Sequence, residues 1–172
     1  AHAGMEIISY VISGQLQHRD SMGNGRTIKP GEFQYMSAGT GVRHSEFNPS
    51  KTDAVHFLQI WITPREKGTE PRYQELAMSE QAKDQALTLV ASPDGRDDSI
   101  KIHQDVDLSF GRLAVDESLA AETSAKSHWV HVISGGIQLH GETLSSGDGA
   151  AIRGDLGEIT ASEKSEFLIF SI

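Results

Sequence analysis

Short apolar segments follow one another along the chain, each bounded by clusters of Gly, Pro, Asn and Asp at a spacing of about 8–12 residues. Residues 87–90 and 166–172 are clear examples of these segments. Such a pattern is typical of antiparallel strands joined by turns in a sandwich or barrel. Helical periodicity is scarce, so the sequence predicts an all-β fold.

One stretch of sequence occurs twice in degenerate form. Residues 11–17 read VISGQLQ, and residues 132–138 read VISGGIQ. Both copies have the pattern of a strand, a glycine turn and a strand, and each is followed by a second turn and strand, KPGEFQYM at residues 29–36 and SSGDGAAI at residues 145–152. The repeat predicts two related β domains in one chain.

The segment between the two copies differs from the rest. Residues 71–85 favour a short helical connection, in which Ser79 caps the turn at residues 80–85 and Glu80 lies near the positive end of the helix dipole. Residues 92–98 form a second segment rich in turn formers and charge. We place the boundary between residues 64 and 100, with one domain at residues 1–90 and the other at residues 91–172.

Residues two apart on a strand share a face, and this rule selects candidate functional side chains. His44 and Glu46 follow a Gly-rich turn and can point together into a barrel, while His2 and Glu6 share parity at the start of a strand. Imidazole and carboxylate groups in a barrel interior suit a divalent first-row metal, with iron(II) favoured when positions stay open for substrate and oxygen. An ordinary polar His/Glu pair is the structural alternative.

The remaining histidines are expected not to be metal ligands. His128 and His131 are three apart, so they face opposite sides of a strand. His18 and His140 lie in or beside hairpin turns and are expected to be solvated, and His56 and His103 are expected to be hydrogen-bonded core or interface residues. Gln59 and Trp61 share a face and either line a pocket mouth or pack inside the domain. No catalytic-triad order, P-loop or dinucleotide-type glycine turn is present, so hydrolase and nucleotide-binding functions have no support.

Composition limits the kinds of molecule that the protein is expected to bind. The net charge of −9, with scattered lysines and arginines, disfavours direct binding to nucleic acid. No apolar run is long enough to cross a bilayer, so we expect no membrane role. The absence of cysteine leaves His and carboxylates as metal ligands and agrees with a cytoplasmic location.

Several motifs together resemble the pirin family of the cupin superfamily. They include the run from His2 to Val11, residues 14–21, and the segment PGEFQYMSAGTGVRHSE at residues 30–46. Residues 58–62, 70–74 and 92–95 also match pirin-like patterns. The resemblance implies a bicupin, with two antiparallel jelly-roll barrels and a short helical connection between them.

The resemblance also implies a metal site in the first barrel only. Pirins carry one metal, usually iron, on three His and one Glu; His2, His44 and Glu46 match three of these ligands, and Glu6 matches a motif glutamate beside the metal. The first histidine of the motif would stand two residues before His2, so we expect further strands ahead of Ala1 and an exposed sheet edge without them. The second copy carries Thr123, Ser127, Ile159 and Ala161 at the positions of His2, Glu6, His44 and Glu46.

Three functions are compatible with these observations. The first, implied by the resemblance, is a metal-dependent dioxygenase of the quercetin 2,3-dioxygenase type, which uses oxygen to open a flavonol or another small aromatic or enediol substrate, with Glu46 accepting the substrate proton. Iron(II) is the expected cofactor, and Mn, Co, Ni, Cu or Zn are alternatives. The second is a metal-binding regulator acting on a protein partner. The third is a metal-free structural bicupin.

Overall fold

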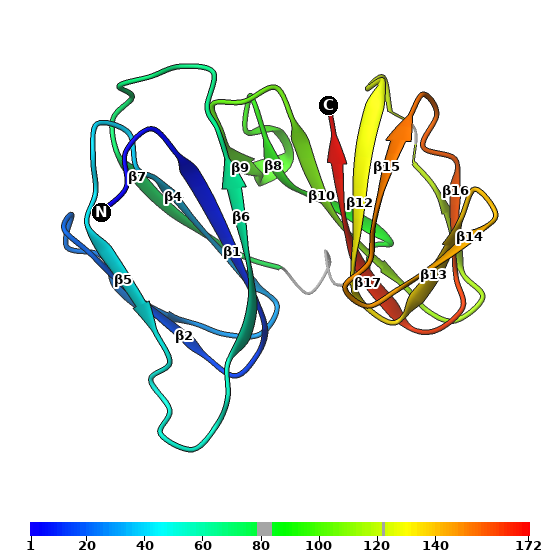
Figure 1. Cartoon of the computed structure of the whole chain (residues 1–172), viewed down its shortest axis with the longest axis horizontal. Helices are drawn as coiled ribbons and strands as arrows, with labels where there is room; N and C mark the ends of the chain where they lie inside the picture. Colours follow the sequence, from blue (N-terminus) through cyan, green and yellow to red (C-terminus); the bar gives the residue numbers. More distant parts are fainter. Residues whose placement is uncertain (79–83, 122) are drawn as a thin grey trace. The chain divides into compact units, whose positions relative to one another are not determined.

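The computed structural model describes residues 1–78, 84–121 and 123–172, which form two compact units (Figure 1). The first unit contains Ala1–Met78 and Ile100–Gln104, and the second contains Ser79–Ser99 and Asp105–Ile172. Apart from the short 3-10 helix η1 (Arg96–Asp98), the described elements are strands. The expected all-β fold is confirmed. The described part of the chain contains no helix with the length and hydropathy needed to span a bilayer.

The first unit consists of two antiparallel sheets. One has the strand order β6-β1-β4-β7 and the other the order β3-β2-β5. The two sheets face each other, because side chains of β1 and β4 contact side chains of β2 and β5. The strands of these sheets are β1 (Glu6–Ser13), β2 (Leu16–Asp20), β3 (Gly25–Ile28), β4 (Glu32–Ser37), β5 (His44–Phe47), β6 (His56–Ile62) and β7 (Arg72–Ala77). The two-residue strand β9 (Ile100–Lys101) also belongs to this unit but to neither of these sheets.

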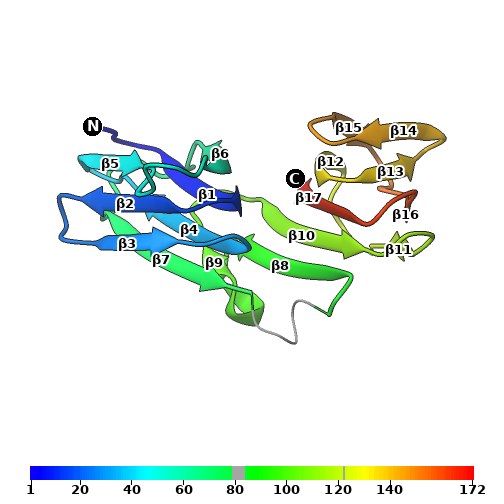
Figure 2. The same ribbon diagram turned by 90° about the horizontal axis from the view of Figure 1, so that it is seen from below.

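The second unit repeats this plan. One sheet includes the order β15-β12-β17-β10-β8, and the other has the order β11-β16-β13-β14 (Figure 2). Its strands are β8 (Leu87–Ser92), β10 (Asp107–Leu113), β11 (Ser118–Ala120), β12 (Ser127–Ser134), β13 (Gly136–Leu139), β14 (Glu142–Ser145), β15 (Gly149–Arg153), β16 (Glu158–Ala161) and β17 (Ser165–Ser171).

The repeated VISG motif forms the same turn in both units. Gly14 lies between β1 and β2 with a φ of 74°, and Gly135 lies between β12 and β13 with a φ of 80°. A Cβ atom at either glycine would approach a backbone carbonyl oxygen, Ala54 O at 2.3 Å or Lys164 O at 2.4 Å. Glycine is therefore required both by the conformation and by the space.

A second turn is also repeated, although its sequence is not. In the first unit the Glu32 carboxylate accepts a hydrogen bond from the Lys29 backbone N–H at 2.8 Å. In the second unit Asp148 accepts from the Ser145 N–H at the same distance. The turn glycine donates back to β1 or β12, as Gly31 does to Val11 O at 3.0 Å. The two units thus share a framework down to individual backbone bonds.

Alternation along β1 decides which residues face the interior between the two sheets. Ile7 packs with Met36 and Val42, and Val11 packs with Leu16, so the odd-numbered residues point toward the second sheet. Ser9 lies between these two apolar clusters, in the same direction. The polar centre of the first unit is therefore flanked by apolar layers.

The helical connection expected at residues 71–85 is wrong over its first half. Residues Arg72–Ala77 form β7, which pairs along its whole length with β4. Pairing with β4 outweighs the weak helical preference of this segment. The expected Ser79 cap and residues 80–83 lie outside the described residues.

Candidate metal centre

Two neighbouring strands bring the titratable side chains of the first unit together. The register of β2 and β5 places His18 directly opposite Glu46, and Asp20 directly opposite His44. Ligand atoms of His18, His44 and Glu46 all lie within 4.8 Å of one another, the one such His/Glu cluster found among the described residues. The i, i+2 spacing of His44 and Glu46 does direct both into the unit.

The Glu46 carboxylate is held from several sides. Gln59 Nε2 donates to Oε2 at 2.5 Å, and Ser9 Oγ donates to Oε1 at 3.4 Å. Trp61 Nε1 donates to Gln59 Oε1 at 3.0 Å, so a chain of hydrogen bonds links the half-exposed Trp61 to the carboxylate. The Glu46 side chain keeps 11% exposure, which leaves it reachable from outside.

His44 has a free ligand atom. Its Nδ1 is buried without a hydrogen-bond partner in the described chain and lies 3.9 Å from Glu46 Oε1. Burial lowers the pKa of His44, with Glu46 opposing the shift, so the ring is neutral near pH 7. A neutral imidazole can offer its nitrogen lone pair to a cation.

His18 is fully buried, so the prediction that it is a solvated turn residue is wrong. Its ring binds Asp20 through Nε2 at 3.1 Å, and Gln34 Nε2 lies 3.4 Å from Nδ1. Burial disfavours the charged ring, but Glu46 and Asp20 outweigh this and raise the pKa of His18. The available signal was parity, because His18 stands two residues after the core residue Leu16 on β2.

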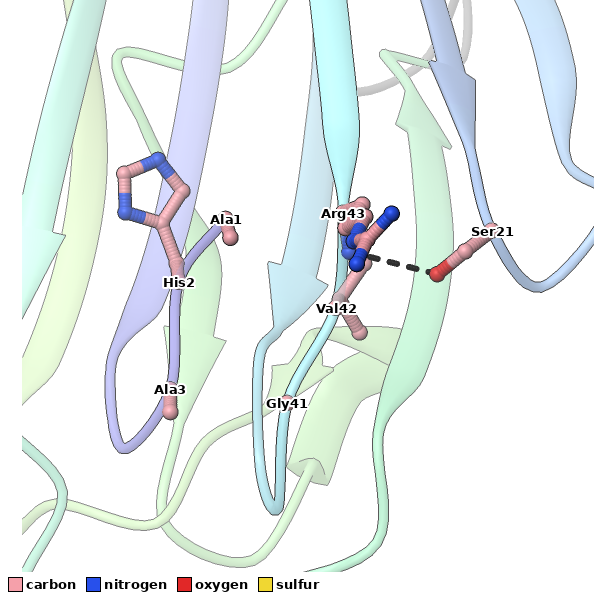
Figure 3. A pocket seen from close by; sticks show the side chains of 7 residues that line it. All are labelled: Ala1, His2, Ala3, Ser21, Gly41, Val42 and Arg43. Carbon is pink, nitrogen blue, oxygen red and sulfur yellow. Dashed lines mark hydrogen bonds between the residues drawn. The ribbon is translucent and has the colours of Figure 1, made fainter.

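His2 lies at the edge of this cluster. Its backbone pairs with that of Val42 in an isolated bridge, and its ring centroid is 4.9 Å from that of His44 and 4.7 Å from that of Trp61. Figure 3 shows the segment from Ala1 to Ala3 beside the segment from Gly41 to Arg43. Together with Ser21, these residues line an open hollow of about 570 Å³. The hollow reaches His2, next to the His/Glu cluster.

The residues present fit a divalent cation. A buried imidazole nitrogen without a hydrogen-bond partner and a carboxylate that offers only lone pairs face each other at His44 and Glu46. Nitrogen and oxygen ligands of this kind are those that first-row divalent metals take in proteins. The arrangement is more specific than an ordinary polar pair, since His44 and Glu46 do not come within hydrogen-bond distance of each other.

Glu6 does not lie beside this cluster, and the expectation that it would is wrong. It is even-numbered on β1 and points away from Ser9 and Glu46. Its carboxylate accepts hydrogen bonds from Tyr35 Oη at 2.5 Å and from the His103 backbone N–H at 2.9 Å. Gly4, with a φ of 64°, turns the chain between His2 and Glu6, so shared parity does not carry across it.

The other histidines differ in how well they were predicted. His103 is hydrogen bonded to Glu6 through Nδ1 at 2.9 Å, as predicted for a core or interface histidine. His56 is exposed, which contradicts the same prediction for it, because it stands at the first position of β6. His140 is exposed in a turn as predicted. His128 is buried, and His131, on the opposite face of β12 as predicted, is less so.

The second unit has apolar residues where the first has its cluster. In the register of β13 and β16, Leu139 stands opposite Ile159, the positions equivalent to His18 and Glu46. Ile159 is therefore the counterpart of Glu46, whereas the sequence alone aligned it with His44 and placed Ala161 at Glu46. The conclusion that these positions lack ligands is unaffected.

Comparison with known proteins identifies the family. A family model described as Pirin matches residues 1–62, and a model described as Quercetinase C-terminal cupin domain matches residues 89–172. A protein from Escherichia coli K12 named quercetin 2,3-dioxygenase is 43% identical over 99% of this chain and 74% of its own length. This chain belongs to the pirin family. A protein from Pasteurella multocida, named putative quercetin 2,3-dioxygenase, is 39% identical over 99% of the chain and 74% of its own length.

Solved pirin structures agree in fold and point to a metal. The crystal structure of YhhW from Escherichia coli matches with a TM-score of 0.93 and 43% identity, covering 99% of this chain and 73% of that one. The bacterial pirin YhhW in complex with nickel(II) matches with a TM-score of 0.91 and 43% identity over the same shares. Together with the His/Glu cluster, these likenesses support a divalent metal in this pirin and confirm the expected bicupin fold.

Proposed function

We propose that this pirin is a metal-dependent dioxygenase that opens the ring of a flavonol such as quercetin, with molecular oxygen as the second substrate. The observation that carries the proposal is the pairing of the free, buried His44 Nδ1 with the Glu46 carboxylate inside the first unit. The relatives named quercetin 2,3-dioxygenase supply the reaction type.

The proposed ligands are His2, His44 and Glu46. His44 and Glu46 face each other directly, and the His2 ring lies against the His44 ring. Iron(II) is the proposed metal, because a mixed His/carboxylate set with open positions is typical of iron(II) oxygenases. The same donor types accept Mn, Co, Ni, Cu or Zn, so metal supply contributes to which ion is bound.

The metal would supply Lewis-acid chemistry, which lowers the pKa of a substrate hydroxyl bound to it. Glu46 is placed to accept that proton, because it remains partly exposed while its oxygens stay oriented by Ser9 and Gln59. Ile7, Met36 and Val42 form an apolar cluster at this end of the unit. These side chains would limit access of water to the reacting groups.

The rings of His2 and Trp61 lie beside the cluster. Trp61 is 46% exposed and meets the His2 ring edge to face, so it offers an accessible aromatic surface next to His2. A planar polyphenol can stack on such a surface.

A cytoplasmic location and a regulatory protein partner, both expected from the sequence, stay predictions.

The test is oxygen uptake with quercetin by iron-loaded protein, compared with His44→Ala and Glu46→Ala. We expect turnover in the unchanged protein and at least a 100-fold loss in both variants. His140→Ala, at an exposed histidine of the second unit, is the matched control and should retain activity. Tight metal binding without oxygen uptake would contradict the dioxygenase proposal and favour the regulatory function.

A further inference from the structure

The strand next to the proposed ligands carries a second pair of polar side chains, Asp20 and His18. Both side chains are completely buried, and both stand directly across from β5 residues: Asp20 opposite His44, and His18 opposite Glu46. Nothing in the proposed dioxygenase chemistry uses either residue. Complete burial of an Asp/His pair is costly unless its hydrogen bonds are satisfied, and here both side chains have partners.

Asp20 is immobilised by the turn that follows β2. Its Oδ1 accepts hydrogen bonds from the backbone N–H groups of Met22 at 2.9 Å and Asn24 at 3.0 Å. Asn24 Nδ2 donates to the other oxygen, Oδ2, at 2.9 Å. These bonds leave Oδ2 facing His18, whose Nε2 donates to it at 3.1 Å. The turn therefore fixes the imidazole ring as well as the carboxylate.

The His18 ring is also held on its face and at its second nitrogen. Tyr73 packs against it with a centroid distance of 5.1 Å, and the Tyr73 hydroxyl donates to Glu75 at 2.7 Å. Gln34 Nε2 lies within hydrogen-bond distance of His18 Nδ1, at 3.4 Å. With both ring nitrogens engaged, His18 differs from His44, whose Nδ1 has no partner in the described chain.

The fixed ring borders the Glu46 carboxylate. His18 Nδ1 lies 3.8 Å from Glu46 Oε1, beyond hydrogen-bond distance but in close contact. Ser9 and Gln59 bind Glu46 from β1 and β6. His18 closes the side toward β2, so the carboxylate is left facing His44 at 3.9 Å.

The second unit provides an internal comparison. Where the first unit has His18 opposite Glu46, the second has Leu139 opposite Ile159 in the same register. Gly141 takes the place of Asp20, two residues after Leu139 in the turn. The Asp/His pair is thus absent where its carboxylate neighbour is absent.

We propose that His18, oriented by Asp20, is a positioning residue that keeps Glu46 turned toward His44 for metal binding. This inference rests on the proposed function, because it assumes that Glu46 binds the metal. A histidine that only filled the core would affect folding without changing the affinity of the folded protein for metal.

The experiment is calorimetric titration of the metal-free protein with Ni²⁺, together with the absorption spectrum of the Co²⁺ form. Loss of an outer partner of a metal ligand commonly weakens affinity about 10–100-fold. We expect that range for His18→Leu, which copies Leu139. We expect it also for Asp20→Asn, because the amide nitrogen that replaces Oδ2 would face the N–H donors of His18 and Asn24. His18→Gln, which can still donate to Asp20, should fall between His18→Leu and the unchanged protein, and the Co²⁺ spectrum should shift in His18→Leu.

Tyr73→Phe is the matched control, because it loses the hydroxyl bond to Glu75 and keeps the ring against His18. It should bind Ni²⁺ as tightly as the unchanged protein. Unchanged affinity and an unchanged Co²⁺ spectrum in folded His18→Leu and Asp20→Asn would overturn the positioning role. Loss of binding beyond 1,000-fold in both His18 variants, with Asp20→Asn unaffected, would overturn it in favour of a ligand. Failure of the unchanged protein to bind Ni²⁺ would instead overturn the proposed function and this inference with it.

Discussion

The two units share a framework but differ at the positions that face the interior. Five polar residues of the first unit have apolar counterparts in the second: Ser9 and Val130, His18 and Leu139, Gln34 and Ala150, Glu46 and Ile159, Gln59 and Ile169. Four of these counterparts belong to one buried hydrophobic cluster, namely Val130, Leu139, Ile159 and Ile169. The same strands and turns therefore enclose a polar centre in one unit and a hydrophobic core in the other.

The polar centre makes the interior of the first unit less stabilising than the hydrophobic core of the second. A buried Ile or Leu contributes roughly 1.5–3 kcal/mol, and the first unit forgoes this at each polar position. Among the described residues it also holds two buried polar atoms that lack hydrogen-bond partners, Gln34 Oε1 and His44 Nδ1, whereas the second unit holds one, His128 Nε2. Unsatisfied groups of this kind cost about 1–3 kcal/mol each and are common where a ligand or a reaction must be accommodated.

The largest expected effect comes from placing the first unit's carboxylate in the second. Ile159→Glu buries a charge among apolar residues without Ser9, Gln59 or His18 to bind it. We expect a loss of about 4 kcal/mol or more in the free energy of unfolding, measured by urea denaturation. Val115→Glu introduces the same side chain at a 57% exposed position and should stay within about 0.5 kcal/mol. A tolerated Ile159→Glu would show that the two interiors are not distinct.

Substituting the glycine of the shared turn should lower the free energy of unfolding equally in both units. Gly14→Ala and Gly135→Ala each combine a positive φ with a Cβ clash against backbone, so each should cost about 3 kcal/mol in urea denaturation. Gly31→Ala and Gly147→Ala also have positive φ but meet no atom within 4 Å, and should cost only about 1 kcal/mol. Markedly unequal costs at Gly14 and Gly135 would argue against an equivalent framework.

The reverse exchange removes the proposed metal ligand. At a free Ni²⁺ concentration 100 times the dissociation constant, binding stabilises a folded protein by about 2.7 kcal/mol. We expect this gain in the free energy of unfolding in the unchanged protein but not in Glu46→Ile. The measurement is thermal unfolding of both proteins with and without Ni²⁺. Glu158→Ile makes the same substitution at an exposed site of the second unit and should keep the gain. A full gain in Glu46→Ile would exclude Glu46 as a ligand.

The smallest expected effect is a pH dependence in the metal-free first unit. The pKa of His18 is raised above 6.5, despite burial, by Glu46 and Asp20. Its contribution to stability is therefore full below pH 6.5 and is lost as the pH rises through the raised pKa. The difference in unfolding free energy between the unchanged protein and His18→Gln should shrink over that window. A difference that grows with pH would contradict the assigned sign.

Local patterns explain what the sequence allowed us to predict. The strands, the duplication and the His44/Glu46 pair depend on spacing of two residues and on glycine turns, which short stretches of sequence encode directly. His18 was missed because it lies near a turn, although its parity with Leu16 placed it inside.

Longer-range features required the structure. The turn after β2, residues 21–24, is longer than the turn after β13, residues 140–141. A single repeat offset therefore fails beyond that turn: it is 121 residues from His18 to Leu139, 116 from Gln34 to Ala150 and 113 from Glu46 to Ile159. Because these length differences accumulate, the sequence alone placed Ile159 two residues away from its true counterpart. Glu6 was assigned to the wrong side because Gly4 turns the chain between it and His2.

The central claim is that the first unit alone binds a divalent metal, and metal content tests it most directly. Elemental analysis after Ni²⁺ loading and dialysis should give one equivalent per chain, absent in His44→Ala. His128 in the second unit also has a buried ring nitrogen without a partner in the described chain, so His128→Ala is the matched control and should keep one equivalent. One equivalent retained in His44→Ala, or lost in His128→Ala, would contradict the account.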